Sequence, residues 1–137
     1  MTDQIIGRSL VVGEATGIAL VTDVPLSLWG GLDPVTGEVI DRRHPLSGHS
    51  LTGRILVLPQ GRGSCSASGV LLEAIRNRTA PAGIVVSTVD PILGLGSILG
   101  EELFRRVVPV VLVSPEDRQS IPADLPVTIR RDGIIRW

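Results

Sequence analysis

Residues 54–76 read RILVLPQGRGSCSASGVLLEAIR, and they carry the chain from an apolar strand through a glycine turn into a helix. The run 54–59 is typical of a buried strand, and residues 70–76 have the apolar spacing of a helix. Ser64 lies at the turn between them. Unpaired backbone N–H groups and the positive end of the helix dipole at such a point favour an anion or an ionised hydroxyl. The stretch therefore predicts that Ser64 belongs to a binding or catalytic site.

This pattern also allows a purely structural role for Ser64. Serine is a preferred N-cap residue and glycine is the usual residue of tight turns, so Ser64 could cap the helix without any chemistry. Gly61 and Gly63, however, leave both approaches to the turn free of side chains, and further hydroxyl and thiol groups follow directly. A cap requires only one hydroxyl. The composition of the turn thus favours a chemical role.

The segments on either side predict a mixed α/β fold in which strands prevail in the first half. Residues 25–34 are expected to form a long irregular loop, and residues 92–104 a helical segment broken by glycines. Residues 127–136 predict a closing hairpin around Asp132-Gly133. The other predicted strands are residues 9–12, 17–21, 83–87 and 107–113.

The chain has 137 residues, of which 43% are hydrophobic, so a single domain over residues 1–137 with a substantial core is expected. A net charge of −1 gives no general attraction to nucleic acid or to an anionic membrane. No apolar run approaches the roughly 20 residues of a membrane span. One cysteine excludes an internal disulfide, and the first residues lack a secretory pattern, so a cytoplasmic location is expected.

Metal and phosphate-loop chemistry find no support in the residues present. The spacing of His44, His49 and Cys65 fits no ordinary zinc site, so no metal is expected on this chain. A phosphate-binding loop of the P-loop type requires a lysine, and the chain has none. Cys65 is expected to pack beneath the turn rather than to act as a nucleophile.

The chain contains the residue types of a Ser-His-Asp hydrolase triad. Its members would be Ser64, His44 or His49, and Asp41 or Asp90. The sequence around the serine is Gly-Arg-Gly-Ser, which differs from the Gly-x-Ser-x-Gly elbow of the α/β-hydrolases. We therefore do not expect a triad.

Trp29 lies in the loop 25–34 and is followed by two glycines, in a chain with only three aromatic residues. Two interpretations of this tryptophan are open. It could plug one end of a barrel, or it could form a wall or docking surface beside the Ser64 turn.

Together these stretches resemble the small subunit, or swivel domain, of aconitase X, a branch of the aconitase superfamily. The resemblance covers nearly the whole chain. Leu28 stands where an aromatic residue is expected in much of that family. The motifs that carry the resemblance are PLSLWGG at 25–31 with Asp33-Pro34 and Thr36-Gly37, Asp41 with His44-Pro45 and Gly48, GRGS at 61–64 with Ser68, and Ala80-Pro81.

This resemblance implies a swivelling β/β/α domain with barrel-like strands and helices packed on one side. It also implies a much larger partner, the aconitase X large subunit, that holds an iron-sulfur cluster and most of the substrate site. No cofactor is expected on this chain alone.

The resemblance further implies a role for the Ser64 turn. In the superfamily a similar Gly-x-Gly-Ser-Ser-Arg turn provides a serine base that abstracts a proton next to a carboxylate. Ser64 matches that serine, whereas Ser66 occupies the position of the arginine, for which Arg62 is a candidate replacement. Ser64 is thus the expected catalytic residue. The expected substrate-binding residues are Gly61, Arg62, Gly63, Cys65 and Ser66.

The implied activity is that of a hydro-lyase subunit that removes water from a hydroxy acid and is inactive without the large subunit. The patterns at 61–72 and 101–110 resemble the bacterial form, which favours cis-3-hydroxy-L-proline dehydratase. The archaeal activity, mevalonate 5-phosphate dehydratase, is the alternative substrate assignment. A non-catalytic binding or regulatory module on the same swivelling fold is the alternative from a different functional class.

Overall fold

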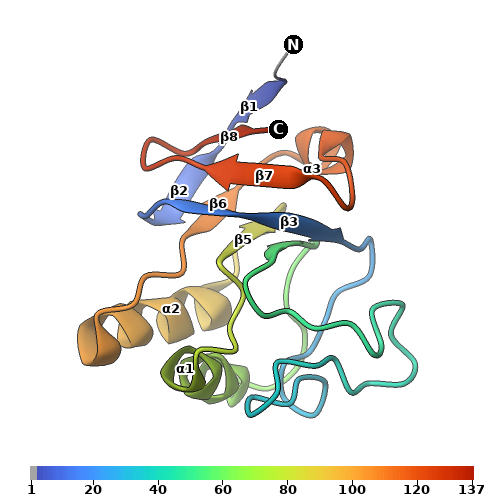
Figure 1. Cartoon of the computed structure of the whole chain (residues 1–137), viewed down its shortest axis with the longest axis vertical. Coiled ribbons are helices and arrows are strands. Elements are labelled where there is room, and N and C mark those ends of the chain that lie inside the picture. Colours follow the sequence, from blue (N-terminus) through green and yellow to red (C-terminus); the bar gives the residue numbers. More distant parts are fainter. Residues whose placement is uncertain (1–2) are drawn as a thin grey trace.

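The computed structural model describes residues 3–137, whose strands form one curved, mixed sheet (Figure 1). Across the sheet the strand order is β1-β8-β7-β3-β4-β5-β6-β2. The central strands β3, β4, β5 and β6 run parallel, and the other pairs are antiparallel. The strands are β1 (Gln4–Ile6), β2 (Arg8–Val11), β3 (Ala15–Val21), β4 (Ile55–Val57), β5 (Gly83–Val86), β6 (Val110–Leu112), β7 (Pro126–Ile129) and β8 (Ile134–Arg136). The helices are α1 (Ala67–Asn77), α2 (Pro91–Phe104) and α3 (Pro115–Ser120).

The sheet curls into a barrel-like shape because the chain bends at Gly7. β1 and β2 are separated by this one residue, yet they pair with β8 and β6 at opposite ends of the strand order. A Cβ atom at residue 7 would collide with the side chain of Val111, so the bend requires glycine. The two ends of the sheet are thereby joined.

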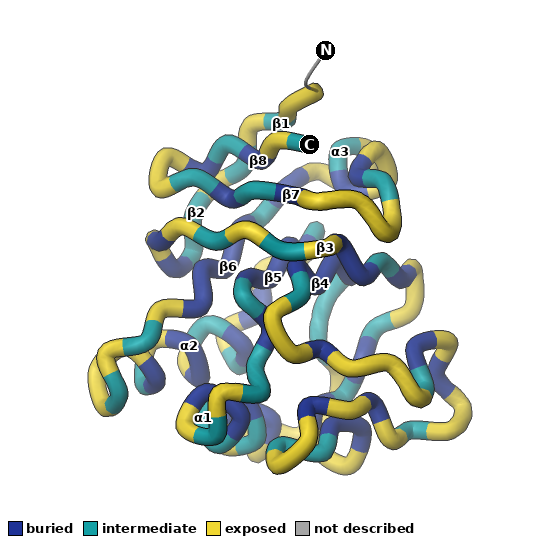
Figure 2. The backbone as a smooth tube through the Cα atoms, viewed as in Figure 1, coloured by how far each residue is buried: buried dark blue, intermediate teal, exposed yellow. Residues whose placement is uncertain are grey.

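Strands β4, β5 and β6 are buried on both faces, which explains their continuous apolar sequences. In β4, Ile55 and Val57 belong to the core inside the barrel, where they pack with residues such as Val85 and Ile129. Leu56 points to the opposite face and joins the core beneath the helices. Figure 2 shows this buried centre in dark blue. The strand predicted over residues 54–59 is therefore confirmed as β4.

Helices α1 and α2 cover one side of the sheet, together with the loops of residues 22–54 (Figure 1). This layer contributes Leu71 and Ile75 of α1 and Leu93 of α2 to the core beneath the helices. The arrangement confirms the expected mixed α/β fold, with barrel-like strands and helices on one side.

The expectation that residues 92–104 are broken by glycine is wrong, because α2 is continuous from Pro91 to Phe104. Two of its glycines, Gly96 and Gly100, lie where α2 contacts α1. A Cβ atom at Gly96 would lie 2.9 Å from the carbonyl oxygen of Ser68, and one at Gly100 would lie 2.5 Å from Cδ1 of Ile75. The close packing of α1 on α2 outweighs the low helix propensity of glycine.

Two short elements, β1 and α3, were not expected from the sequence. α3 begins with Ser114, whose Oγ accepts a hydrogen bond of 3.1 Å from the N–H of Asp117, and proline follows at the first helical position. The predicted hairpin is confirmed as β7 and β8, and Gly133 has the positive φ of 88° that its turn requires.

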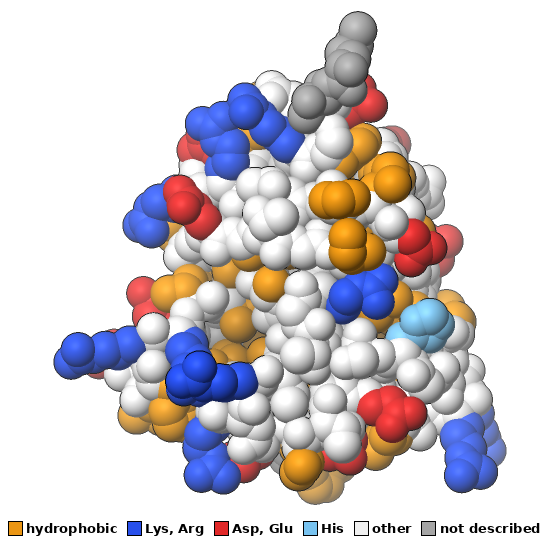
Figure 3. Space-filling view, viewed as in Figure 1, with side chains coloured by type: hydrophobic (Ala, Val, Ile, Leu, Met, Phe, Trp, Pro, Cys, Tyr) orange, Lys and Arg blue, Asp and Glu red, His pale blue; other side chains and the backbone are white. Residues whose placement is uncertain are grey.

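The first and last strands lie side by side, because β1 pairs with β8 at the end of the molecule remote from α1 and α2 (Figure 1). On the face drawn in Figure 3, arginine and acidic side chains both occur over the strands and over the helical layer. Within residues 3–137, none of the helices has the length and apolarity needed to cross a membrane.

Candidate functional site

The two stretches singled out in the sequence lie side by side. Beyond β4, Gly61 forms an isolated parallel bridge with Leu26. The N–H of Arg62 donates to the carbonyl of Leu26 at 3.1 Å, and the N–H of Leu26 donates to the carbonyl of Gln60 at 3.4 Å. The loop 25–34 therefore forms one wall of the region around Ser64.

The turn before Ser64 depends on glycine. Gly63 has a φ of 95°, a conformation that residues with a Cβ atom rarely adopt. A Cβ atom at this residue would also lie 2.9 Å from Oγ of Ser27. Gly63 thus lets the chain turn while it passes close to the loop 25–34.

Ser64 does not cap α1. The helix begins at Ala67, the capping position is Ser66, and the Ser66 side chain makes no capping hydrogen bond. Oγ of Ser64 instead accepts a hydrogen bond of 3.1 Å from the backbone N–H of Ser66. The interpretation of Ser64 as a helix cap is therefore wrong, and its exposed hydroxyl lies one turn ahead of the helix.

The backbone around Ser64 presents unpaired hydrogen-bond donors. Within residues 3–137, the backbone N–H groups of Gly63, Ser64 and Cys65 have no hydrogen-bond acceptor. The described first turn of α1 has no acidic side chain to offset the positive end of the helix dipole. The Ser64 turn can thus receive an anionic group on its backbone.

Near the other end of α1, a hydrogen bond from Arg76 to Glu73 raises the pKa of Arg76.

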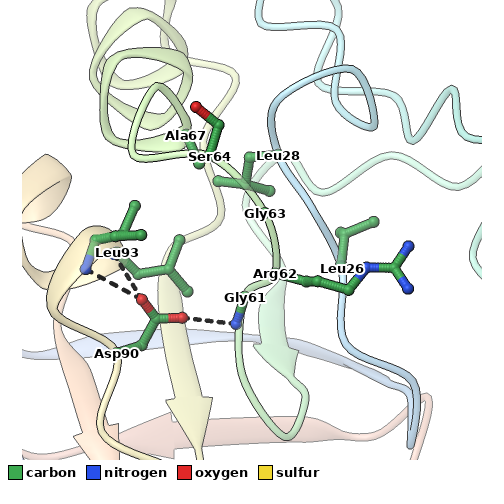
Figure 4. Close-up of a pocket in the computed structure, with 10 residues that line it drawn as sticks. Leu26, Leu28, Gly61, Arg62, Gly63, Ser64, Ala67, Asp90 and Leu93 are labelled. Carbon is green, nitrogen blue, oxygen red and sulfur yellow. Dashed lines mark hydrogen bonds between the residues drawn. The ribbon is translucent and has the colours of Figure 1, made fainter.

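A cavity of about 60 Å³ lies beside the turn (Figure 4). Ordinary small-molecule pockets have volumes of about 300–1,000 Å³, so this cavity alone is too small to enclose a typical small-molecule ligand. Figure 4 shows the Arg62 side chain leaving the loop on the side of Leu26, away from the Ser64 hydroxyl. The residues that line the cavity include Leu26, Leu28, Gly61, Ser64, Asp90 and Leu93.

Asp90 is a residue of this cavity that the sequence did not place beside Ser64. Its side chain is only 8% exposed. Oδ1 accepts hydrogen bonds from the N–H groups of Ile92 and Leu93, both at 3.1 Å, and Oδ2 accepts one from Gly61 at 2.6 Å. The sequence does contain a signal for the role of Asp90 at the start of α2. It is the pair Asp90-Pro91, an N-cap residue followed by proline at the first helical position.

Two other expectations are wrong. Cys65 is exposed rather than packed beneath the turn, and the nearby buried hydroxyl is that of Ser68, which donates to the carbonyl of Ile92 at 2.7 Å. Trp29 is 60% exposed, so it does not plug one end of the barrel. It follows Leu28, which is buried and lines the cavity, so the interpretation of Trp29 as a docking surface is kept.

His44 is not available as the histidine of a Ser64 triad. His44 is buried, with Nε2 at 3.1 Å from the carbonyl oxygen of Val24 and Nδ1 accepting from the N–H of Leu46 at 3.0 Å. Backbone groups thus occupy both ring nitrogens. In the described part of the chain, no three His, Cys, Asp or Glu side chains are grouped so that they could hold a metal ion.

Known proteins similar to this chain include members of two dehydratase groups. It is 54% identical over 106 residues to the cis-3-hydroxy-L-proline dehydratase of Pseudomonas aeruginosa, a match that covers 77% of this chain and 18% of that protein. It is 56% identical over 88 residues to the phosphomevalonate dehydratase small subunit of Methanopyrus kandleri, with 64% and 65% covered. The chain thus spans about a fifth of the length of the first relative.

The fold is shared with a solved structure of the same family. The crystal structure of Thermococcus kodakaraensis aconitase X in its holo-form superimposes with a TM-score of 0.87 at 33% identity and covers 97% of this chain and 96% of that one. The family model described as the aconitase X swivel domain matches residues 4–137. The resemblance seen in the sequence is therefore confirmed, and this chain belongs to the aconitase X swivel domain family.

Proposed function

We propose that this chain is the swivel part of an aconitase X-type dehydratase, and that Ser64 is the base that removes a carbon-bound proton from a hydroxy acid. The observation that carries the proposal is the hydrogen bond of 3.1 Å from the N–H of Ser66 to Oγ of Ser64, on an exposed turn at the positive end of α1. Residues 1–137 act as one domain in this proposal, within a cytoplasmic enzyme.

The turn would lower the cost of ionising a serine, which is a poor base in water. A backbone N–H that donates to an alkoxide makes a charge-assisted hydrogen bond worth about 1.5–3 kcal/mol. In the reaction, the C–H bond next to the carboxylate breaks and its proton passes to Oγ of Ser64. A carbon-carbon double bond forms as the C–O bond breaks, and the hydroxyl group leaves as water with a proton taken from solvent. Oγ of Ser64 then returns its proton to solvent, which restores the base.

The remaining groups of the site would come from a larger polypeptide. Residues 3–137 contain no group of side chains that fits an iron-sulfur cluster, so the cluster expected in this family would lie on the partner. When bound there, it would supply a Lewis acid for the departing hydroxyl. Because the cavity of about 60 Å³ encloses so little, we expect this chain to be inactive without the large subunit.

The proposed substrate is cis-3-hydroxy-L-proline. This assignment is supported by the Pseudomonas aeruginosa relative, whose match covers 77% of this chain, against 64% for the Methanopyrus kandleri relative. Mevalonate 5-phosphate is the second candidate, because identity to the phosphomevalonate dehydratase small subunit is just as high, at 56%.

The first test is anaerobic co-expression with the large partner, followed by dehydration assays on both substrates. We expect turnover of cis-3-hydroxy-L-proline by the complex and none by the isolated chain. Turnover of mevalonate 5-phosphate alone would reverse the substrate assignment. A stable complex inactive on both substrates would remove both assignments, and failure to form a complex would favour the non-catalytic module.

Trp29 is expected to contribute to the contact with the large subunit. Exposed aromatic residues beside a site are frequent interface anchors, and truncating one often costs more than about 1 kcal/mol of binding. We therefore expect Trp29→Ala to raise the Kd of the complex about tenfold or more. Titration calorimetry measures this effect, with Val35→Ala as the control, since Val35 is 70% exposed in the turn 33–37. Equal Kd values for the two variants would exclude a special role for Trp29.

A further inference from the structure

We infer that Asp90 is the positioning residue for Ser64, an inference that rests on the proposed function. The Asp90 carboxylate divides its two oxygens between two elements. Oδ1 caps α2 through the N–H groups of Ile92 and Leu93, and Oδ2 accepts the N–H of Gly61 at 2.6 Å. Gly61 is the start of the turn that carries Ser64, so one buried side chain fixes both the helix and the base of the turn.

Capping alone does not account for this arrangement. An N-cap needs one oxygen, whereas the second oxygen of Asp90 reaches a residue that lies 29 positions away in the sequence. A Cβ atom at Gly61 would lie 2.8 Å from that oxygen, so the close approach depends on glycine. Asp90 is itself buried with its oxygens occupied, and it is therefore placed to hold the turn rather than to accept the substrate proton.

Within residues 3–137 the turn is held at both ends, because the carbonyl of Ser64 accepts the N–H of Ala67 in α1 at 3.0 Å while Gly61 holds the start of the turn. On the side opposite Asp90, Gly61 and Arg62 are tied to Leu26 by the parallel bridge and by the hydrogen bond of 3.1 Å. Beyond these ties Gly63 and Ser64 are exposed. Loss of the Gly61 tie would free the start of the turn to shift, and a proton transfer loses rate steeply when the proton acceptor moves by as little as about 1 Å.

Asp90→Asn separates the two roles of the carboxylate. Asparagine is as good an N-cap as aspartate, so its single carbonyl oxygen can keep the bonds to Ile92 and Leu93. Its NH₂ group then faces the N–H of Gly61 and cannot accept a hydrogen bond from it. The variant keeps the start of α2 and loses the tie to the turn.

The experiment compares Asp90→Asn with Ser114→Ala in the assembled dehydratase. Ser114 caps α3, so its replacement measures how much the loss of a helix cap away from the turn affects the enzyme by itself. We expect Asp90→Asn to lower kcat at least tenfold, to change KM less than threefold, and to speed hydrogen exchange at the Gly61 amide at least tenfold. Ser114→Ala should change none of these values. Unchanged exchange at Gly61, or a loss of kcat no greater than in the control, would overturn the inference.

A double variant shows whether Asp90 acts through Ser64. In the Ser64→Ala background, Asp90→Asn should cause no further loss of turnover, since the group that it positions is gone. Multiplied losses would contradict this coupling. Full activity of Ser64→Ala alone would instead remove the proposed base, while exchange at Gly61 would still report whether Asp90 orders the turn.

Discussion

Ser64→Ala is expected to lower kcat of the assembled dehydratase by about 10²–10⁴-fold, the range typical for loss of a general base. The complex should form normally, because Ser64 is exposed and its hydroxyl only accepts one hydrogen bond from the N–H of Ser66. KM should change little, since the hydroxyl acts on the proton rather than on the bound groups of the substrate. Steady-state dehydration assays, with complex formation checked by gel filtration, measure these effects.

The control for this variant is Ser120→Ala. Ser120 is also an exposed serine, but it lies at the end of α3 and its Oγ donates to the carbonyl of Asp117 at 2.6 Å. Its replacement should leave kcat unchanged. If Ser64→Ala retains more than half of the original kcat, Ser64 is not the base and the proposed mechanism is wrong.

Gly96→Ala and Gly94→Ala are expected to change stability in opposite directions, although both lie in α2. Alanine favours a helix over glycine by about 1 kcal/mol, and a Cβ atom at Gly94 meets no atom within 4 Å. A Cβ atom at Gly96 would lie 2.9 Å from the carbonyl oxygen of Ser68, which is backbone and cannot rotate away. Overpacking of this kind costs about 1–3 kcal/mol. The gain from helix propensity is common to both variants, so they should differ by the overpacking cost of about 1–3 kcal/mol in the free energy of unfolding.

Urea unfolding of the two variants measures this difference. Ser68 lies in the first turn of α1, so displacement at Gly96 should also disturb the Ser64 turn and lower kcat, whereas Gly94→Ala should leave kcat unchanged. Stabilisation by both substitutions would show that α1 and α2 are less tightly packed than the structure indicates.

The sequence predicted the centre of the fold well because the signals there are local. β4 is apolar throughout since it is buried on both faces, and Asp132-Gly133 has the chemistry of a tight turn. The glycines of α2 gave a wrong prediction because helix propensity is a local quantity and the close contact with α1 is not. Tertiary packing against α1 therefore keeps residues 91–104 in one continuous helix.

The site was predicted only where the chain itself brings residues together. The turn from Gly61 to Ser64 is contiguous, so its composition could be interpreted directly. Asp90 shows a readable N-cap signal, but the partner of its second oxygen depends on how α2 is placed against the turn. Cys65 was misplaced because the residues that face the core just beyond the turn are Ala67 and Ser68.

The pairing of β1 with β8 has a consequence for how this domain can be joined to other polypeptides. The first and last strands meet at the end of the molecule opposite α1 and α2, so a linker attached to either strand starts away from the Ser64 turn (Figure 1). The same fold can therefore serve as a segment of a long chain, as in the Pseudomonas aeruginosa relative, or as a separate small subunit, as in the Methanopyrus kandleri relative. Either arrangement can therefore leave the Ser64 turn clear of the linker.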